Sequence, residues 1–105
     1  MVSDASINMI VERIVERFHP QRVILFGSHA RGQAGPDSDV DLLVVFPEVS
    51  NKREAAIQIR RILSDLTIPT DIIVTSPDEI RERGDLVGTV LRPALREGKV
   101  VYERA

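Results

Sequence analysis

The stretch SDVDLLVVF at residues 38–46 carries the strongest strand signal in the chain. Its apolar run begins at Val40, and Pro47 ends it because proline has no amide hydrogen to offer a strand ladder. Alternation along a strand places Asp39 and Asp41 on one face, about 7 Å apart, and turns Val40 toward the core. The stretch therefore predicts a buried strand whose first residues present two carboxylates to one side.

This pair of aspartates is a candidate metal site. Strands disfavour aspartate, and like charges on one strand face repel each other unless a cation lies between them. Carboxylate oxygens are ligands that Mg²⁺ accepts, so Asp39 and Asp41 could hold one or two ions. Asp71 begins the strand predicted at 70–75, and three carboxylates converge if that strand lies beside the first. The alternative interpretation is that these acids only solvate the ends of strands.

A second motif, Gly27-Ser28, directly follows the apolar run 23–26, which predicts a short buried strand. Glycine lets the backbone approach a ligand closely, and free amides at a helix start, with the Ser28 hydroxyl, suit phosphate oxygens. We expect Ser28 to cap a short helix over 28–31. Arg31 then lies on the same helix face and could pair with the same phosphates. An ordinary turn with a solvated arginine is the alternative.

The rest of the chain alternates helix and strand patterns. The capping box at 76–79 predicts a helix start, because its serine and glutamate can each bond a free amide of the other. The other expected elements are helices at 7–18 and 51–66, a helical stretch from 85 to about 98, and an edge strand at 100–102. This order predicts one layered α/β domain over residues 1–105, with a mixed sheet of three or four strands. Helices lie mainly on one face and leave the other face free for a site.

Composition excludes several classes of function. The net charge of −2 provides no basic field for a polyanion, and four aromatic residues are too few for a base-stacking platform, so a long nucleic acid is not the expected ligand. Cysteine is absent, which rules out disulfides and thiolate metal sites. No apolar stretch approaches the ~20 residues that span a bilayer, and no signal peptide is visible. The expected location is the cytoplasm.

The two motifs together resemble a known family. The stretch LFGSHARG at 25–32 and the stretch SDVDLLV at 38–44 are similar to the signature of the DNA polymerase β-like nucleotidyltransferase superfamily. Within it, the sequence closely resembles the minimal nucleotidyltransferases, the antitoxin halves of HEPN/MNT pairs. Their pattern of Gly-Ser, ten residues and Asp-x-Asp is matched without a gap. The resemblance covers nearly the whole chain and includes an ending similar to residues 96–103.

This resemblance implies a polymerase β palm-like fold and transfer of AMP from ATP to a hydroxyl acceptor with release of pyrophosphate. It implies that Asp39, Asp41 and Asp71 form the catalytic and metal-binding set, with two Mg²⁺ ions. It also implies that Gly27 and Ser28 hold the β- and γ-phosphates. The implied acceptor is a tyrosine of a HEPN-family protein partner. The residues themselves identify neither the base nor the oligomeric state, so a homo-oligomer and a hetero-oligomer with the partner both stay open.

Two other functions are also open. One is a binding module, an antitoxin that neutralises its partner by covering it; the intact motif residues argue against a fully degenerate site. The other is a modifier of small molecules, but such relatives carry an additional helical domain that 105 residues do not hold. Template-directed polymerisation is excluded for the same reason. His29, Arg60 and Arg61 are interpreted as ordinary surface residues.

Overall fold

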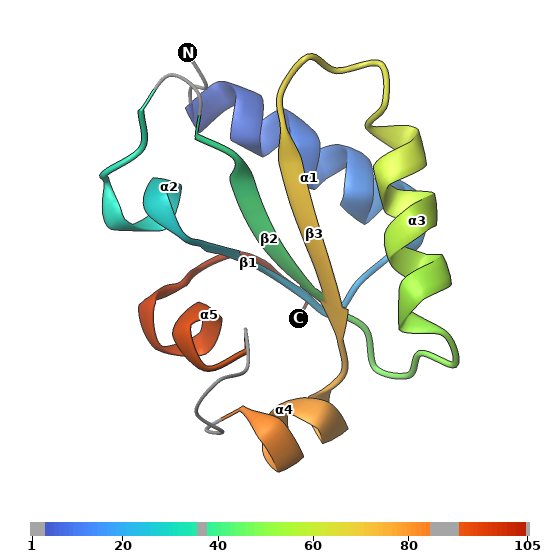
Figure 1. Ribbon diagram of the computed structural model, residues 1–105. Coiled ribbons are helices and arrows are strands. Elements are labelled where there is room, and N and C mark those ends of the chain that lie inside the picture. Colours follow the sequence, from blue (N-terminus) through green and yellow to red (C-terminus); the bar gives the residue numbers. More distant parts are fainter. Residues whose placement is uncertain (1–3, 36–37, 85–90, 105) are drawn as a thin grey trace.

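The strands form one mixed sheet in the computed structural model, which describes residues 4–35, 38–84 and 91–104 (Figure 1). The order across the sheet is β3-β2-β1-β4. Strand β1 is antiparallel to β2 and β4, whereas β2 is parallel to β3. This confirms the predicted mixed sheet, including the edge strand near the end of the chain. The strand bounds are Arg22–Phe26 for β1, Val40–Val45 for β2, Thr70–Thr75 for β3 and Lys99–Glu103 for β4.

Two long helices cover one face of this sheet. Helix α1 (Asp4–Phe18) and helix α3 (Lys52–Ile62) bury their apolar sides against the even-numbered residues of β2, as their helical spacing predicts. Asn51 caps α3, because its side chain accepts a hydrogen bond of 3.0 Å from the Glu54 amide. Three isoleucines are fully buried in this layer: Ile10, Ile14 and Ile59.

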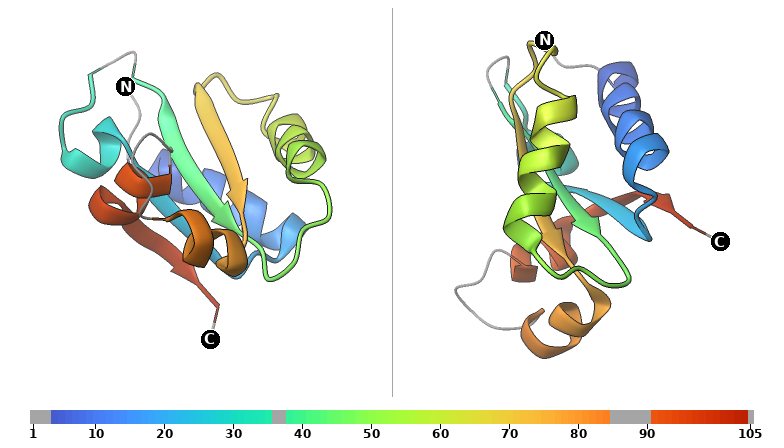
Figure 2. Two further views of the ribbon diagram at one scale, coloured as in Figure 1. Left: turned by 60° about the horizontal axis from the view of Figure 1, so that its bottom comes forward. Right: turned by 90° about the vertical axis from the view of Figure 1, so that its right-hand side faces the viewer.

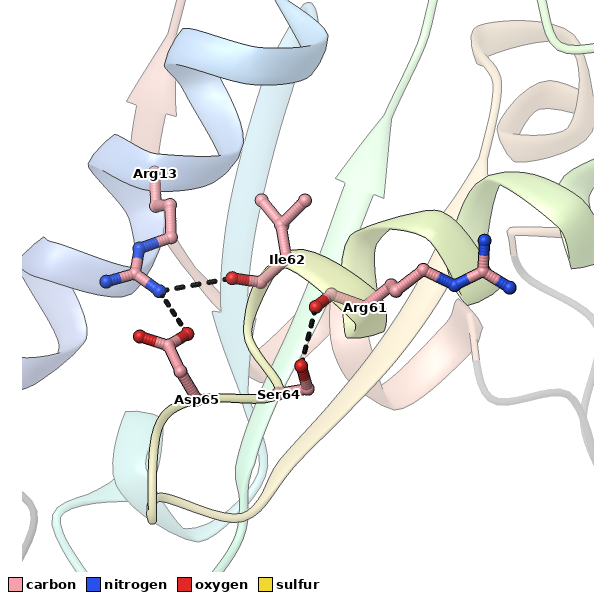
Figure 3. A network of polar contacts seen from close by, with 5 residues as sticks. All are labelled: Arg13, Arg61, Ile62, Ser64 and Asp65. Carbon is pink, nitrogen blue, oxygen red and sulfur yellow. Dashed lines mark hydrogen bonds and ion pairs between the residues drawn. The ribbon is translucent and has the colours of Figure 1, made fainter.

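Polar contacts of Arg13 connect α1 to the end of α3 (Figure 3). The Arg13 Nη1 atom donates to the Ile62 carbonyl at 3.1 Å and pairs with the Asp65 Oδ1 atom at 2.6 Å. The Ser64 hydroxyl donates to the Arg61 carbonyl at 2.8 Å, which closes a turn. These turn bonds end α3 at Ile62, four residues before the predicted end.

Short helices lie on the opposite face, as the right-hand view of Figure 2 shows. Helix α4 (Pro77–Arg83) begins after Ser76, whose side chain accepts a bond from the Glu79 amide as predicted. Helix α5 (Leu91–Glu97) packs Leu91 and Ala94 against the sheet, so this face is partly covered. The part of the predicted helical stretch at 85–90 lies outside the described residues. Within the described part of the chain, no helix has both the length and the apolar character needed to cross a bilayer.

Candidate functional site

The sheet brings two of the three predicted acids together. Asp41 and Asp71 are register partners on the parallel strands β2 and β3. Neighbouring strands lie about 4.8 Å apart, so the two carboxylates start from adjacent backbone positions. Both point to the face that carries α5, because Leu43 and Ile73, two residues further along each strand, pack there. The expectation that β3 lies beside the strand of Asp39 and Asp41 is therefore confirmed.

The electrostatics of Asp41 reflect this crowding. Burial raises the pKa of the Asp41 carboxyl, and the negative charges of Asp71 and then Asp39 raise it further. His29 and Arg31 act in the opposite direction but do not cancel the increase in pKa. The predicted repulsion between the acids is present, but burial is the larger cause of the raised pKa of Asp41.

The acids fit a divalent cation in ligand type and charge. Carboxylate oxygens are the ligands that Mg²⁺ prefers, and a cation between Asp41 and Asp71 would relieve the repulsion that raises the pKa of Asp41. Among the described residues, however, no three histidine, aspartate or glutamate side chains lie together in an arrangement that could hold a metal ion.

Gly27 packs directly against one of these carboxylates. Gly27 connects β1 to α2 (Ser28–Arg31) with φ 73° and ψ −154°. Residues other than glycine rarely adopt this backbone conformation. A Cβ atom on Gly27 would lie 2.1 Å from the Asp41 Oδ2 atom, closer than any real contact. Glycine is thus required here both by its backbone angles and by its approach to Asp41. The predicted approach of this backbone to a ligand stays a prediction.

Ser28 and Arg31 lie on α2 beside the acids, but Ser28 does not cap this helix. Gly27 occupies the cap position, and its carbonyl accepts bonds of 3.2 Å from the amides of Ala30 and Arg31. The prediction of a Ser28 cap is wrong because Gly27, with its unusual backbone angles, takes the cap position, so the helix starts one residue earlier than expected. Within the described part of the chain, the Ser28 hydroxyl has no hydrogen-bond partner, which leaves it available to a ligand.

The sequence analysis interprets His29 and Arg60 as ordinary surface residues, but both make contacts near the acids. His29 is half-buried, and its Nε2 atom lies 3.2 Å from the Ser38 carbonyl, so it braces the segment that leads into Asp39. Arg60 reaches from α3 around the edge of β3, where its Nη2 atom lies 4.0 Å from the Asp71 Oδ1 atom. The same atom donates to the Ile72 carbonyl at 3.3 Å. No local pattern signals either contact, since each depends on how distant elements pack.

The geometry at Gly27 leads to a stability prediction. Gly27→Ala should lower the free energy of unfolding by about 3 kcal/mol or more, because backbone strain of about 1–3 kcal/mol is added to a clash with Asp41. Gly32→Ala is the matched control: Gly32 also has positive φ, 70°, but nothing lies within 4 Å of its added Cβ. Its cost should be about 1–2 kcal/mol. Denaturant titration of both variants measures the difference, and equal losses would contradict the clash.

The raised pKa of Asp41 leads to a second prediction, on pH. Because the pKa is higher in the folded chain than in the unfolded chain, ionisation of Asp41 lowers stability as pH rises through the range of an ordinary carboxyl. Without divalent cations, Asp41→Asn should therefore melt at a higher temperature than wild type at pH 7. The difference should shrink below about pH 4, where both side chains are neutral. Thermal unfolding from pH 3 to pH 8 tests this; a gain that does not depend on pH would count against it.

The sequence is similar to known proteins over most of its length. A profile described as a nucleotidyltransferase domain matches residues 7–98, most of the chain. A relative from Methanocaldococcus jannaschii, provisionally named a protein adenylyltransferase, is 41% identical over 54 residues. That alignment covers 51% of this chain and 54% of the relative, so the chain matches about half of the relative's length.

Solved structures share the fold. A protein from Sulfolobus solfataricus, provisionally described as a nucleotidyltransferase, aligns with a TM-score of 0.65 and 25% identity over 93% of this chain and 78% of that chain. A chain in the complex of the tri-AMPylated Shewanella oneidensis HEPN toxin with MNT antitoxin aligns with a TM-score of 0.59. There the identity is 20%, over 92% of this chain and 69% of that chain, so this likeness concerns the fold alone. The expected fold class is confirmed.

Proposed function

The chain belongs to the nucleotidyltransferase domain family, and we propose from this membership that it transfers AMP from ATP to a hydroxyl group of a protein partner, releasing pyrophosphate. The observation that carries the proposal is the pairing of Asp41 with Asp71 beside the close approach of Gly27. Carboxylates that repel each other are suited to binding a cation rather than to packing. The backbone turn beside them is suited to binding a phosphate.

The reaction is a displacement at the α-phosphorus of ATP. The acceptor oxygen forms a bond to this phosphorus while the bond to the oxygen that bridges to the β-phosphorus breaks. Pyrophosphate leaves with the electron pair, and the hydroxyl proton passes to a carboxylate, for which Asp71 is the candidate. Attack and departure in line require the acceptor and the pyrophosphate on opposite sides of the phosphorus. Asp71 on β3 and Gly27 at the end of β1 flank Asp41 from opposite sides and suit these two positions.

We propose that Asp39, Asp41 and Asp71 hold two Mg²⁺ ions. When bound, Mg²⁺ neutralises charge on the phosphates and lowers the pKa of the attacking hydroxyl. The chain's own contribution is to place Asp41 and Asp71 on one face of the sheet, with Asp39 directly before β2. Most of the catalytic effect then comes from positioning and charge compensation rather than from covalent chemistry with the protein.

On the other side of Asp41, Gly27, Ser28 and Arg31 are proposed to bind the β- and γ-phosphates. Gly27 has no side chain of its own to keep a phosphate away from its backbone. The Ser28 hydroxyl can donate to a phosphate oxygen, and the Arg31 guanidinium supplies positive charge. With the phosphates bound on the Gly27 side of Asp41, the acceptor side of the site stays open at β3, where half of the Asp71 side chain is exposed.

The proposed acceptor is a tyrosine of a HEPN-family toxin, and the proposed biological role is that of a cytoplasmic antitoxin. The M. jannaschii relative is named for AMP transfer to protein, and the S. oneidensis complex pairs an MNT antitoxin with an AMP-modified HEPN toxin. The pairing of Asp41 with Asp71 beside Gly27 supports such a transfer. A single domain over residues 1–105 is proposed to carry the activity together with its partner.

The test uses ATP labelled at two different phosphates. The chain is incubated with Mg²⁺, ATP and a lysate of its source, and labelled proteins are identified by mass. We expect label from the α-phosphate, but none from the γ-phosphate, on one protein that copurifies with the chain. Label from the γ-phosphate would mean a kinase, and no label from either phosphate would refute the proposed transfer.

A further inference from the structure

The guanidinium of Arg31 is held from two sides. Its Nη1 atom lies 3.3 Å from the Glu97 Oε2 atom, and its Nε atom donates to the Gln33 Oε1 atom at 3.2 Å. Within the described residues its Nη2 atom has no hydrogen-bond partner. The side chain is 42% exposed, so the unused edge of the guanidinium is accessible to a ligand.

Glu97, one of the two residues that hold Arg31, lies in a tightly packed part of the fold. Glu97 is the last residue of α5, whose Leu91 and Ala94 are buried against the sheet. The next residue, Gly98, touches β1 so closely that an added Cβ would lie 2.5 Å from the Ile24 Cγ2 atom. This tight packing fixes the end of α5 on the strand that leads into Gly27, and with it the position of the Glu97 backbone.

The held guanidinium also belongs to the candidate site. Arg31 lies on α2, which begins directly after Gly27, the residue that packs against Asp41. It is on the same four-residue helix as Ser28. An arginine in this place can meet the phosphates of a nucleotide that reaches over Gly27 toward Asp41.

We propose that Glu97 is a positioning residue for the triphosphate, which holds Arg31 so that the free edge of its guanidinium faces the phosphates. The proposal rests on the proposed function, because it takes ATP as the ligand of this site. A free arginine side chain loses considerable rotamer entropy when it binds an anion, whereas one that is already held loses less. Glu97 therefore acts on ATP binding through Arg31 and does not itself touch the nucleotide.

Charge alone would act in the opposite direction. Glu97 is negative and repels phosphates, so a purely electrostatic role predicts that its removal improves ATP binding. Two substitutions separate these effects, because Glu97→Ala and Glu97→Gln both remove the charge but only glutamine keeps an oxygen that can accept from Arg31. Positioning predicts that the two variants differ, and charge repulsion predicts that they behave alike.

The experiment measures ATP affinity calorimetrically in the presence of Mg²⁺, and KM and kcat for AMP transfer. Glu97→Ala should raise both the Kd and the KM for ATP about three- to tenfold with little change in kcat, and Glu97→Gln should restore most of the loss. Glu103→Ala is the matched control, since Glu103 pairs with Arg22 at 3.5 Å at the far end of β1 from Gly27. This control should leave ATP affinity unchanged.

A double variant completes the test. In an Arg31→Ala background, Glu97→Ala should have no further effect on the Kd, because the residue through which it acts is gone. Independent effects of the two substitutions, or tighter binding by both Glu97 variants, would overturn the positioning role. If wild type binds ATP but transfers no AMP, the Kd series still tests Glu97 while the proposed function fails. If wild type binds no ATP, both are refuted.

Discussion

Asp41→Asn is expected to reduce AMP transfer about a thousandfold or more. Asparagine keeps the shape of aspartate but loses the charge that would hold a cation, and metal-ion stabilisation of a transition state is worth several kcal/mol, with tenfold in rate for each 1.36 kcal/mol. Asp39→Asn should have an effect of the same order, since Asp39 lies directly before β2 and its charge raises the pKa of Asp41. Label transfer from α-phosphate-labelled ATP measures both losses.

Stability distinguishes this loss from misfolding. Asp41→Asn should melt no lower than wild type at neutral pH, because it removes a carboxylate whose ionisation opposes folding. Asp65→Asn is a suitable control. Asp65 is an exposed aspartate that follows α3 in the chain and pairs with Arg13, as Figure 3 shows. Its transfer rate should match that of wild type. Full activity of Asp41→Asn would show that the site lies elsewhere.

The same variants separate an enzyme from a binding module. A chain with both Asp39→Asn and Asp41→Asn keeps its fold and its surface shape, so it should still copurify with its partner. An antitoxin that acts by modification should then fail to neutralise, whereas one that acts by covering its partner should succeed. Coexpression with the partner, scored by growth and by the partner's mass, decides between them. Full neutralisation by the double variant, with no added nucleotide in wild type, would favour the binding module.

Local sequence was sufficient for the strands and for the candidate acids. The stretches 40–46 and 70–75 are apolar runs bounded by proline, glycine or polar residues, and the strands β2 and β3 begin where predicted. Alternation alone places Asp41 opposite the core-facing Val40 and Leu42, and both of these are fully buried. These features depend on neighbours in sequence, which is why they could be predicted without a structure.

The arrangement around the acids depends on long-range packing and could not be predicted in this way. The register that sets Asp41 beside Asp71 joins segments thirty positions apart, and Arg60 meets Asp71 only because α3 runs along β3. The end of α5 beside Arg31 is another example, since the pair joins the second helix to the fifth. The sequence alone identifies the candidate residues, but it does not show which positively charged side chains lie beside them.

Asp71→Asn should reduce kcat about 100- to 10,000-fold, the usual contribution of a positioned general base. Asp71 is the outermost of the three acids, because β3 is the edge of the sheet, and its side chain is 52% exposed toward the side from which an acceptor can arrive. Asparagine cannot take the hydroxyl proton. The effect on kcat should therefore be large even if Asp39 and Asp41 still hold a cation.

The KM for ATP separates this role from one in nucleotide binding. The proposed phosphate contacts of Gly27, Ser28 and Arg31 lie beyond Asp41 and are untouched by the change, so Asp71→Asn should leave the KM for ATP within about threefold of wild type. Asp78→Asn, an exposed aspartate that pairs with Arg81 on α4, serves as the control and should change neither constant. A large rise in KM with an unchanged kcat would move Asp71 from the acceptor side of the reaction to the nucleotide side. Steady-state kinetics with the partner protein as acceptor supply both values.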